Sequence, residues 1–210
     1  MDSSQKENWL KKEKNISCGV GGFLLELIKI VLWAFLIIAP VRIFLFQPFF
    51  VQGASMEPTF ENNQYLIINE LGYKKTEVGF PGKGFFSVEP FKKLKRGDVV
   101  VFHYPKNRSQ FFIKRIIGLS GEKIEIKNNR VTVYNSNNPG GLILDEKDYL
   151  PEGIHTSGES VIELKENEYF VMGDNRMFSS DSRSWGPVLD SDIIGKVFLR
   201  AWPPNNITIF

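Results

Sequence analysis

The sequence predicts a mainly β domain that follows a single N-terminal membrane-spanning helix. Two observations support this fold class. From Phe23 to Val51 the chain is dominated by Leu, Ile, Val and Phe, and after it come short runs rich in Val, Ile and Phe that end at turn residues. A chain of 210 residues is long enough for one domain of ordinary size with a sound core, plus an anchor.

Charged residues interrupt the apolar segment, and its longest charge-free run is Ile30 to Val41. Such a run alone is too short to cross about 30 Å of hydrocarbon at 1.5 Å per residue. If Lys29 and Arg42 extend towards opposite surfaces, a helix from about Leu24 reaches the required length. We therefore assign residues 24–46 to a membrane anchor.

The charge around the anchor predicts its orientation. Four lysines precede it, so the positive-inside rule places residues 1–23 in the cytoplasm and residues 47–210 outside. A cleavable signal would require a small-residue cleavage site after the apolar run, and none follows it. A buried core helix is disfavoured because the segment is apolar on all sides. The single cysteine, Cys18, excludes an intrachain disulfide.

The strands of the β domain are indicated by short β-branched and aromatic runs. The clearest hairpin has two alternating runs separated by Asn128 and Asn129, a residue type that tolerates the positive φ of a tight turn. Two stretches, 72–97 and 135–160, resist assignment and are expected to be long excursions from an antiparallel sheet. The expected strands are 65–69, 98–104, 111–117, 123–127, 130–134, 169–173 and 193–200.

Composition excludes some classes of function. The formal net charge is +2, from 26 basic and 24 acidic residues, so the chain lacks the basic surface of a nucleic-acid-binding protein. It also lacks a cluster of cysteines and histidines with the spacing of metal ligands. We therefore expect neither nucleic acid nor a metal or cofactor at its functional site.

A serine and a lysine are candidates for chemistry. Ser55 lies in the segment Gly-Ala-Ser-Met-Glu-Pro-Thr just after the apolar run, and Lys114 follows 59 residues later in a strand-like run. A serine hydroxyl needs a base before it is a good nucleophile. Lysine can serve only when it is neutral, which requires desolvation. In an extended strand Lys114 shares its face with Phe112 and Ile116, so apolar surroundings are expected.

Other interpretations of these residues stay open on pattern alone. Lys114 could be an edge-strand lysine that protects against aggregation, and Ser55 could be an ordinary turn serine. His103 or His155 could act as the base instead, although neither lies in a local catalytic signature.

Four blocks of sequence follow the anchor in order and favour the catalytic interpretation of Ser55 and Lys114. They are SMEPT at 55–59, RGDVVVF at 96–102, KRIIGLSGE at 114–122, and GDNR at 173–176 followed by SSDSRSWG at 179–186. With these blocks the chain resembles the bacterial type I signal peptidases, membrane-bound serine proteases that remove signal peptides from exported proteins. The resemblance extends from about residue 30 to 202, and the blocks together are highly specific.

The resemblance implies a catalytic domain of signal-peptidase type and a role for each matching residue. Ser55 would be the nucleophile, with its backbone N–H donating to the oxyanion, and Lys114 would be the general base. Ser179 would hydrogen-bond the lysine amine and orient it. Asp181 and Arg183 would brace the site as an ion pair.

The chain departs from many relatives at two places. Some relatives carry a serine two residues before the nucleophile, whose hydroxyl completes the oxyanion hole, but this chain has Gly53. Met177 and Phe178 stand where many relatives have Asp-Asn, so polar contacts made there in other family members are not expected here.

The expected substrate is a preprotein bound as an added strand. The small residues Gly53 and Ala54 would let a peptide approach the backbone, and shallow apolar pockets would accept small side chains at the first and third positions before the cut. The lipid bilayer and transiently the secretion machinery are the other expected partners, with aromatic residues just after the anchor near the lipid. The alternatives are a Ser/Lys protease with other targets and an inactive membrane-anchored β module that binds peptides or partner proteins. The residues expected to bind substrate are Val51, Gly53, Met56, Phe112 and Ile113.

Overall fold

The computed structural model describes residues 20–44, 46–73, 76–80 and 83–210. The chain divides into two compact units, residues 1–43 and residues 44–210, and each is described here by itself. The predicted orientation depends on the four upstream lysines, which lie outside the described residues, as does Cys18.

The first unit is built on the helix α2, Val20–Phe44. Its 25 residues give a length of about 37 Å at 1.5 Å per residue. The window Gly21–Ile38 has a mean hydropathy of 2.2 and none of it is buried, so the helix is long and apolar enough to cross a membrane. Within it Lys29 pairs with Glu26 at 2.9 Å, which offsets two of the charges that interrupt the apolar run.

The boundaries of this helix differ from the predicted anchor, residues 24–46. The helix begins at Val20, inside the segment assigned to the tail, because residues 20–22 are uncharged and extend the apolar run by one turn. It ends at Phe44, and Phe46 is the first residue of the strand β1, Phe46–Phe50. Pro48 disfavours the α conformation at the preceding residue, Gln47, so the chain is extended there and does not continue the helix. Pro48 lies within β1, which is at the edge of its sheet, where proline is tolerated.

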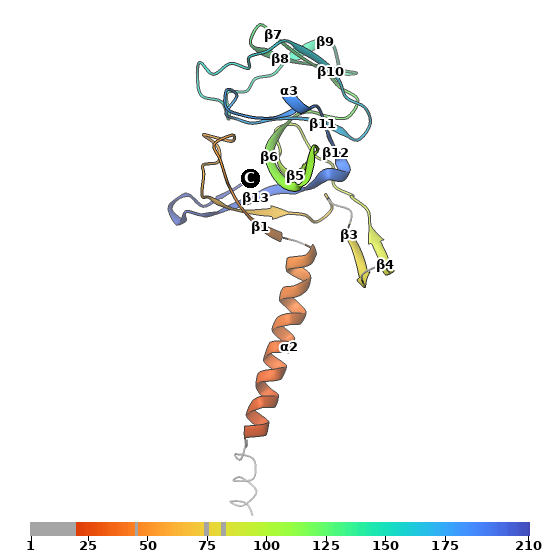
Figure 1. Cartoon of the computed structure of the whole chain (residues 1–210), viewed down its shortest axis with the longest axis vertical. Coiled ribbons are helices and arrows are strands. Elements are labelled where there is room, and N and C mark those ends of the chain that lie inside the picture. The colour runs from red at the N-terminus through yellow and green to blue at the C-terminus, as the bar shows by residue number, and fades with distance from the viewer. Residues whose placement is uncertain (1–19, 45, 74–75, 81–82) are drawn as a thin grey trace, which may run out of the picture. The chain divides into compact units, whose positions relative to one another are not determined.

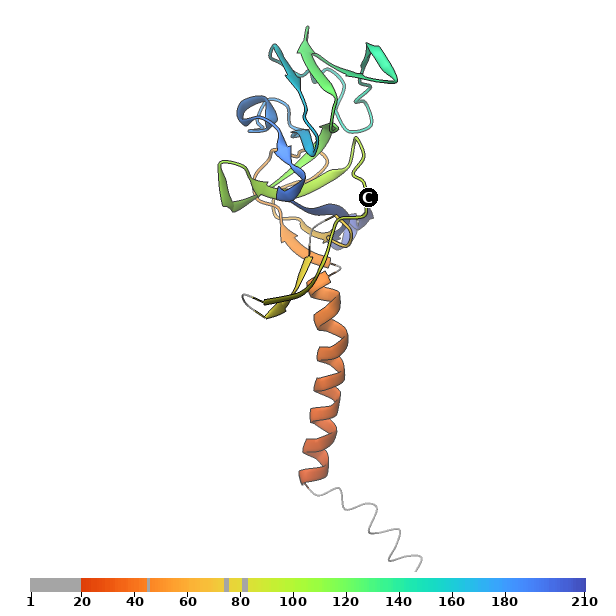
Figure 2. The same ribbon diagram turned by 90° about the vertical axis from the view of Figure 1, so that its right-hand side faces the viewer.

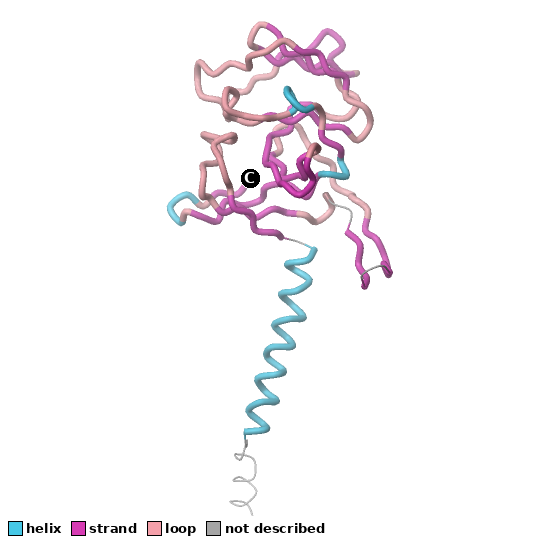
Figure 3. The backbone as a smooth tube through the Cα atoms, viewed as in Figure 1, coloured by secondary structure: helices cyan, strands magenta, loops and turns pink. Residues whose placement is uncertain are grey.

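The second unit is mainly antiparallel β structure, as the sequence predicts (Figure 3). Among its described residues an eight-stranded sheet has the order β1-β2-β13-β5-β6-β11-β12, with β14 paired to β13. The helix α3, Ser182–Trp185, is a single turn that follows β11 in the chain. The strands after β1 are β2 Tyr65–Asn69, β5 Val99–Tyr104, β6 Asn107–Gly118, β11 Glu168–Met172, β12 Val188–Leu189, β13 Ile193–Trp202 and β14 Thr208–Ile209.

A four-stranded antiparallel sheet, in the order β10-β7-β8-β9, forms the other large part of this unit, again counting described residues only. Figure 1 shows it grouped apart from β5, β6 and β13, and the turned view in Figure 2 shows the same separation. Its predicted hairpin is confirmed: Asn128 and Asn129 have φ of 50° and 61°, as a two-residue turn with two left-handed residues requires. Its strands are β7 Lys123–Lys127, β8 Arg130–Asn135, β9 Asn138–Ile143 and β10 Ser160–Glu163.

The two stretches that the sequence left unassigned, 72–97 and 135–160, contain strands. The stretch 72–97 contains the hairpin of β3, Thr76–Phe80, and β4, Lys83–Val88. The stretch 135–160 contains β9, which pairs with β8. Both were missed because glycine and proline weaken the strand signal, as in the sequence Asn-Pro-Gly-Gly of β9.

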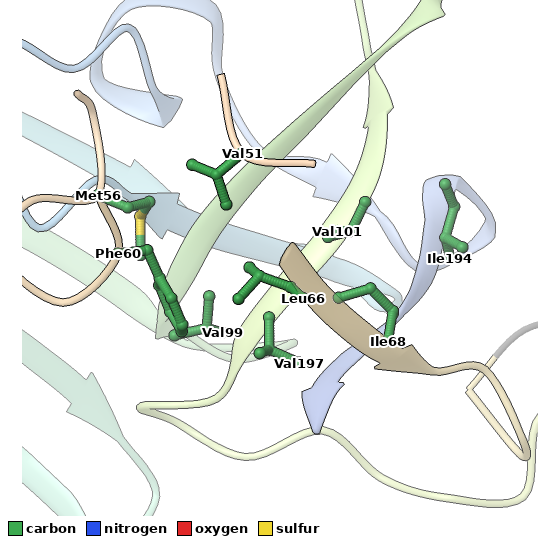
Figure 4. Packing of buried hydrophobic residues seen from close by; sticks show 9 residues of the cluster. All are labelled: Val51, Met56, Phe60, Leu66, Ile68, Val99, Val101, Ile194 and Val197. Atoms are coloured by element: carbon green, nitrogen blue, oxygen red, sulfur yellow. The ribbon is translucent and has the colours of Figure 1, made fainter. Parts of the chain in front are cut away.

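Three clusters of buried apolar residues form the core. The cluster shown in Figure 4 joins β2, β5 and β13 to the segment that follows β1. That segment contributes Val51, Met56 and Phe60, and Figure 4 shows Met56 lying against Phe60. The backbone that carries Ser55 is therefore fixed on both sides by buried side chains.

Candidate active site

Ser55 lies on a turn that is anchored in the core. The Glu57 N–H donates to the Ala54 carbonyl at 3.2 Å, and the Phe60 N–H donates to the Met56 carbonyl at 2.8 Å. Met56 is only 1% exposed, and Ser55 itself is half-buried. The turn thus presents the serine hydroxyl from a rigid support.

Lys114 comes from the middle of the large sheet. It lies in β6, which pairs with β5 on one side and β11 on the other, so it is not an edge-strand lysine. Its side chain is 3% exposed, and its Nζ lies 2.7 Å from Ser55 Oγ. The same Nζ donates to the Ile113 carbonyl at 2.8 Å. The structure therefore brings together the two residues that the sequence singled out.

Burial lowers the pKa of Lys114 from 10.5 to about 8, because the charged amine loses its hydration. The carboxylates of Asp181 and Asp174 oppose this shift, since they attract the charged form. The Phe112 ring, 5.4 Å from Nζ, is part of the apolar surroundings that the strand pattern predicted. A pKa of about 8 gives roughly 300-fold more neutral amine at pH 7 than a pKa of 10.5. This lysine is suited to accept a proton.

A third segment, residues 173–183, is held against the turn that carries Ser55. The Asn175 N–H donates to the Ser55 carbonyl at 3.1 Å, and Asn175 Nδ2 donates to the Ala54 carbonyl at 3.1 Å. At Gly173 an added Cβ would lie 2.3 Å from the Ser55 carbonyl oxygen and 2.2 Å from Ser179 Oγ. Glycine is needed here because the two segments approach so closely.

Asp181 and Arg183 form an ion pair in this segment. Arg183 Nε donates to Asp181 Oδ1 at 2.8 Å, and a second guanidinium nitrogen donates to Oδ2 at 2.9 Å. Asp181 is fully buried and also accepts from the Gly173 N–H at 3.1 Å. The pair thus fixes the fold of the segment that contacts Ser55, and within the described part of the chain neither of its side chains makes a hydrogen bond to Ser55 or Lys114.

Ser179 is close to the site but makes no contact with the lysine amine at hydrogen-bond distance. Its Oγ is buried and has no hydrogen-bond partner among the described residues. A buried hydroxyl without a partner costs about 1–3 kcal/mol. The orienting role that the resemblance assigns to Ser179 stays a prediction, and in this structure the Ile113 carbonyl holds the amine.

An arginine next to the lysine, which the sequence reasoning missed, forms a second buried ion pair. Arg115 binds Asp174 through two hydrogen bonds of 2.8 and 2.6 Å and also donates to the Gly97 carbonyl at 2.8 Å. Both residues stand within the quoted sequence blocks, but no spacing signal connects positions so far apart. The pair ties β6 to the start of the segment 173–183.

A third pair connects this segment to the stretch 135–160. The guanidinium of Arg176 binds both carboxylate oxygens of Glu146, at 2.9 and 2.6 Å, and also donates to Thr156 Oγ1. Tyr149 donates to Glu146 at 2.8 Å, and its ring lies beneath the guanidinium groups of Arg115 and Arg176, at 4.2 and 5.9 Å. Burial, followed by the nearby Glu146 carboxylate, raises the pKa of Tyr149. The stretch 135–160, to which the sequence assigned no role, therefore supports the segment 173–183 of the candidate site through Arg176.

A cleft of about 730 Å³ opens beside the Ser55 hydroxyl. Residues 49–55 form one wall and residues 110–114 the other. Of the five predicted substrate-binding residues, four line it: Val51, Gly53, Phe112 and Ile113. Met56 does not, because its side chain packs into the core. Phe178 and Ser180 also line the cleft and were not among the predicted residues.

Gly53 has a backbone conformation that explains its identity. Its φ is +93°, in the left-handed region that favours glycine, and its N–H donates to Asn62 Oδ1 at 2.9 Å. Open space surrounds the position of a Cβ, so conformation and not crowding restricts it. A serine here would be strained, which fits the absence of a side-chain oxyanion donor at this position.

Known proteins are similar to this chain over most of its length. The profile of the family described as signal peptidase, peptidase S26, matches residues 24–202. Signal peptidase I P of Bacillus subtilis subsp. natto is 34% identical over 187 residues, which cover 88% of this chain and 92% of that protein. Signal peptidase IB of Staphylococcus aureus is 31% identical, with 86% and 90% covered, and signal peptidase I of Bacillus caldolyticus is 33% identical, with 80% and 85% covered. The chain belongs to the signal peptidase family, peptidase S26, as its motifs predicted.

Proposed function

We propose that this protein is a type I signal peptidase in which Ser55 is the nucleophile and Lys114 the general base. The reaction is hydrolysis of one peptide bond, which releases an exported protein from its signal peptide. The observation that carries the proposal is the 2.7 Å distance between Ser55 Oγ and Lys114 Nζ, since this amine is buried and its pKa is lowered.

The mechanism starts from the neutral amine. Lys114 takes the proton of the Ser55 hydroxyl as Oγ attacks the carbonyl carbon, and the Ser55 N–H donates to the oxyanion. The Lys114 ammonium then gives a proton to the leaving amine, which becomes the N-terminus of the mature protein. Water hydrolyses the acyl-enzyme with Lys114 again as base. The Asp181–Arg183 pair braces the site, and Ser179 orients the amine when substrate is bound.

The substrate binds as an extended strand between the two walls of the cleft. One wall, residues 110–114, lies within β6, and the other begins with the end of β1, so both offer strand backbone beside the cleft. Val51 and Ile113 belong to a core cluster or pack against it, so the pockets beneath the strand are shallow. Shallow apolar pockets accept small side chains at the first and third positions before the cut.

The membrane arrangement completes the proposal. The N-terminal tail lies in the cytoplasm, the helix Val20–Phe44 is the anchor, and residues 46–210 form the peptidase domain outside. Phe46, Phe49 and Phe50 lie near the lipid interface. The preprotein reaches the cleft from the secretion machinery, with which contact is transient.

The competing function is a membrane-anchored module that binds peptides without cutting them. A binding module has no use for a buried lysine with a lowered pKa beside a serine. To separate the two, the detergent-solubilised full chain is incubated with a preprotein, and the products are identified by mass spectrometry. We expect one cut after a small residue by the parent chain and no cut by Ser55→Ala. Binding without cleavage by the parent would favour the module, and cleavage by Ser55→Ala would exclude the proposed nucleophile.

A further inference from the structure

The cleft has an aromatic residue on its rim that no described side chain covers. Phe178 lines the cleft together with Ser55 and Lys114, yet it is 76% exposed, the largest fraction among the exposed large apolar side chains. A large apolar side chain that faces a binding cleft gains free energy only when a ligand covers it. Phe178 therefore has the properties of a contact residue for substrate.

The position of Phe178 is fixed relative to the nucleophile. Its N–H donates to the Asn175 carbonyl at 3.1 Å, and the Asn175 N–H donates to the Ser55 carbonyl at 3.1 Å. The intervening Arg176 is buried, and its carbonyl accepts from Arg183 at 2.7 Å. The turn that carries Phe178 is thus bonded to the turn that carries the reacting atom and is not a free loop tip.

The lining of the cleft divides into a floor and a rim. Val51, Leu66 and Val101 line the cleft and are buried, so they form its floor, whereas the exposed Phe178 stands on the rim. Side chains alternate in direction along an extended strand. If the first and third residues before the cut enter the floor, the second residue before the cut and the first residue after it point towards the rim.

We infer that Phe178 is a specificity-determining residue that selects an apolar side chain at one of these two rim-facing positions. The inference rests on the proposed function, because it needs the peptide to lie in this cleft. It names a preference beyond the small residues expected at the first and third positions. Met177, the neighbour of Phe178, is 72% exposed but does not line the cleft, so it should not share in the selection.

The test compares four forms of the full chain in detergent: the parent, Phe178→Asn, the apolar replacement Phe178→Leu and the matched control Met177→Asn. Preprotein substrates carry Leu or Ser at the second position before the cut, or Leu or Ser at the first position after it. For the parent we expect kcat/KM to favour Leu over Ser at one of these positions by about 5- to 10-fold, as for partial burial of an apolar group. Phe178→Asn should reduce that ratio to below about twofold, Phe178→Leu should retain most of it, and Met177→Asn should leave it as in the parent.

The affinities of the same preproteins for the Ser55→Ala chain, with and without Phe178→Asn, give the Leu-to-Ser preference in binding, without cleavage. The inference and the proposed function can therefore fail separately. A Leu-to-Ser ratio that Phe178→Asn leaves unchanged would overturn the inference. So would an effect confined to the first and third positions, or an equal loss in Met177→Asn. The same rates are also measured in lipid vesicles. If Phe178→Asn and Met177→Asn lower cleavage equally and only in vesicles, both side chains contact the membrane and the inference is overturned.

Discussion

Replacement of Lys114 by methionine is expected to lower kcat for signal-peptide cleavage by about 10⁴-fold, the scale on which a lost general base acts. Methionine has similar length and fits an apolar environment, but it has no amine to accept the Ser55 proton. Cleavage is measured on a preprotein under single-turnover conditions, so that product release does not limit the rate.

The same substitution should not lower stability. The unfolded chain binds a proton at this lysine up to a pKa of about 10.5, but the folded chain releases it at about 8. The native fold therefore gains stability as the pH rises from about 8 to 10.5, and at pH 7 it carries the full cost of a poorly hydrated ammonium. Lys114→Met removes that cost, and its unfolding temperature at pH 7 should equal or exceed that of the parent.

Lys123→Met, on β7 away from the cleft, is the control and should keep full activity. If Lys114→Met is inactive because it is unfolded, the Ser/Lys mechanism is tested by Ser55→Ala instead. Cleavage retained by Ser55→Ala would contradict that mechanism.

Glu146→Gln should lower the unfolding temperature by roughly 6–12 °C, equivalent to about 3 kcal/mol in a domain of this size. The reason is the buried guanidinium of Arg176, whose side chain has no exposed surface and depends on both carboxylate oxygens of Glu146. An amide of the same shape removes the charge and one acceptor, so a buried positive charge remains poorly paired. The measurement is thermal unfolding followed by loss of near-ultraviolet circular dichroism.

Asp145→Asn is the matched control for Glu146→Gln. Asp145 is the preceding residue, and its ion pair with Lys147 is long, at 3.5 Å, and exposed on both sides. Such surface pairs contribute little, so its unfolding temperature should not change measurably. An equal effect of the two substitutions would show that the stretch 135–160 does not support the segment 173–183 through Arg176.

Much of the fold was predictable because its signals are local. The strands β2 and β7 have the predicted bounds, and the Asn128-Asn129 turn has the predicted conformation. Each depends on alternation or turn chemistry within a few residues. By contrast β9 was missed, since its pairing with β8 outweighs the poor strand propensity of proline and glycine.

The candidate site was less predictable from local pattern than the strands, because its residues come from distant parts of the chain. The pattern of β6 indicated an apolar environment for Lys114, but only the family resemblance placed it near Ser55. Met56 was misassigned to the cleft because a sequence does not show on which side of a turn a side chain packs. The pairing of Arg176 with Glu146 connects residues 30 positions apart through a buried contact, and no local pattern encodes such a pairing.

The pH dependence of kcat/KM for preprotein cleavage, measured from pH 5 to 10, tests the central claim that a neutral Lys114 activates Ser55. The rate should rise about tenfold per pH unit up to a break near 8 and then level off, because only the neutral amine accepts the proton. A break near 6.5 would indicate a histidine base in place of Lys114. A rate that does not change between pH 6 and 9 would show that no group with the pKa of Lys114 takes part, and would contradict the account.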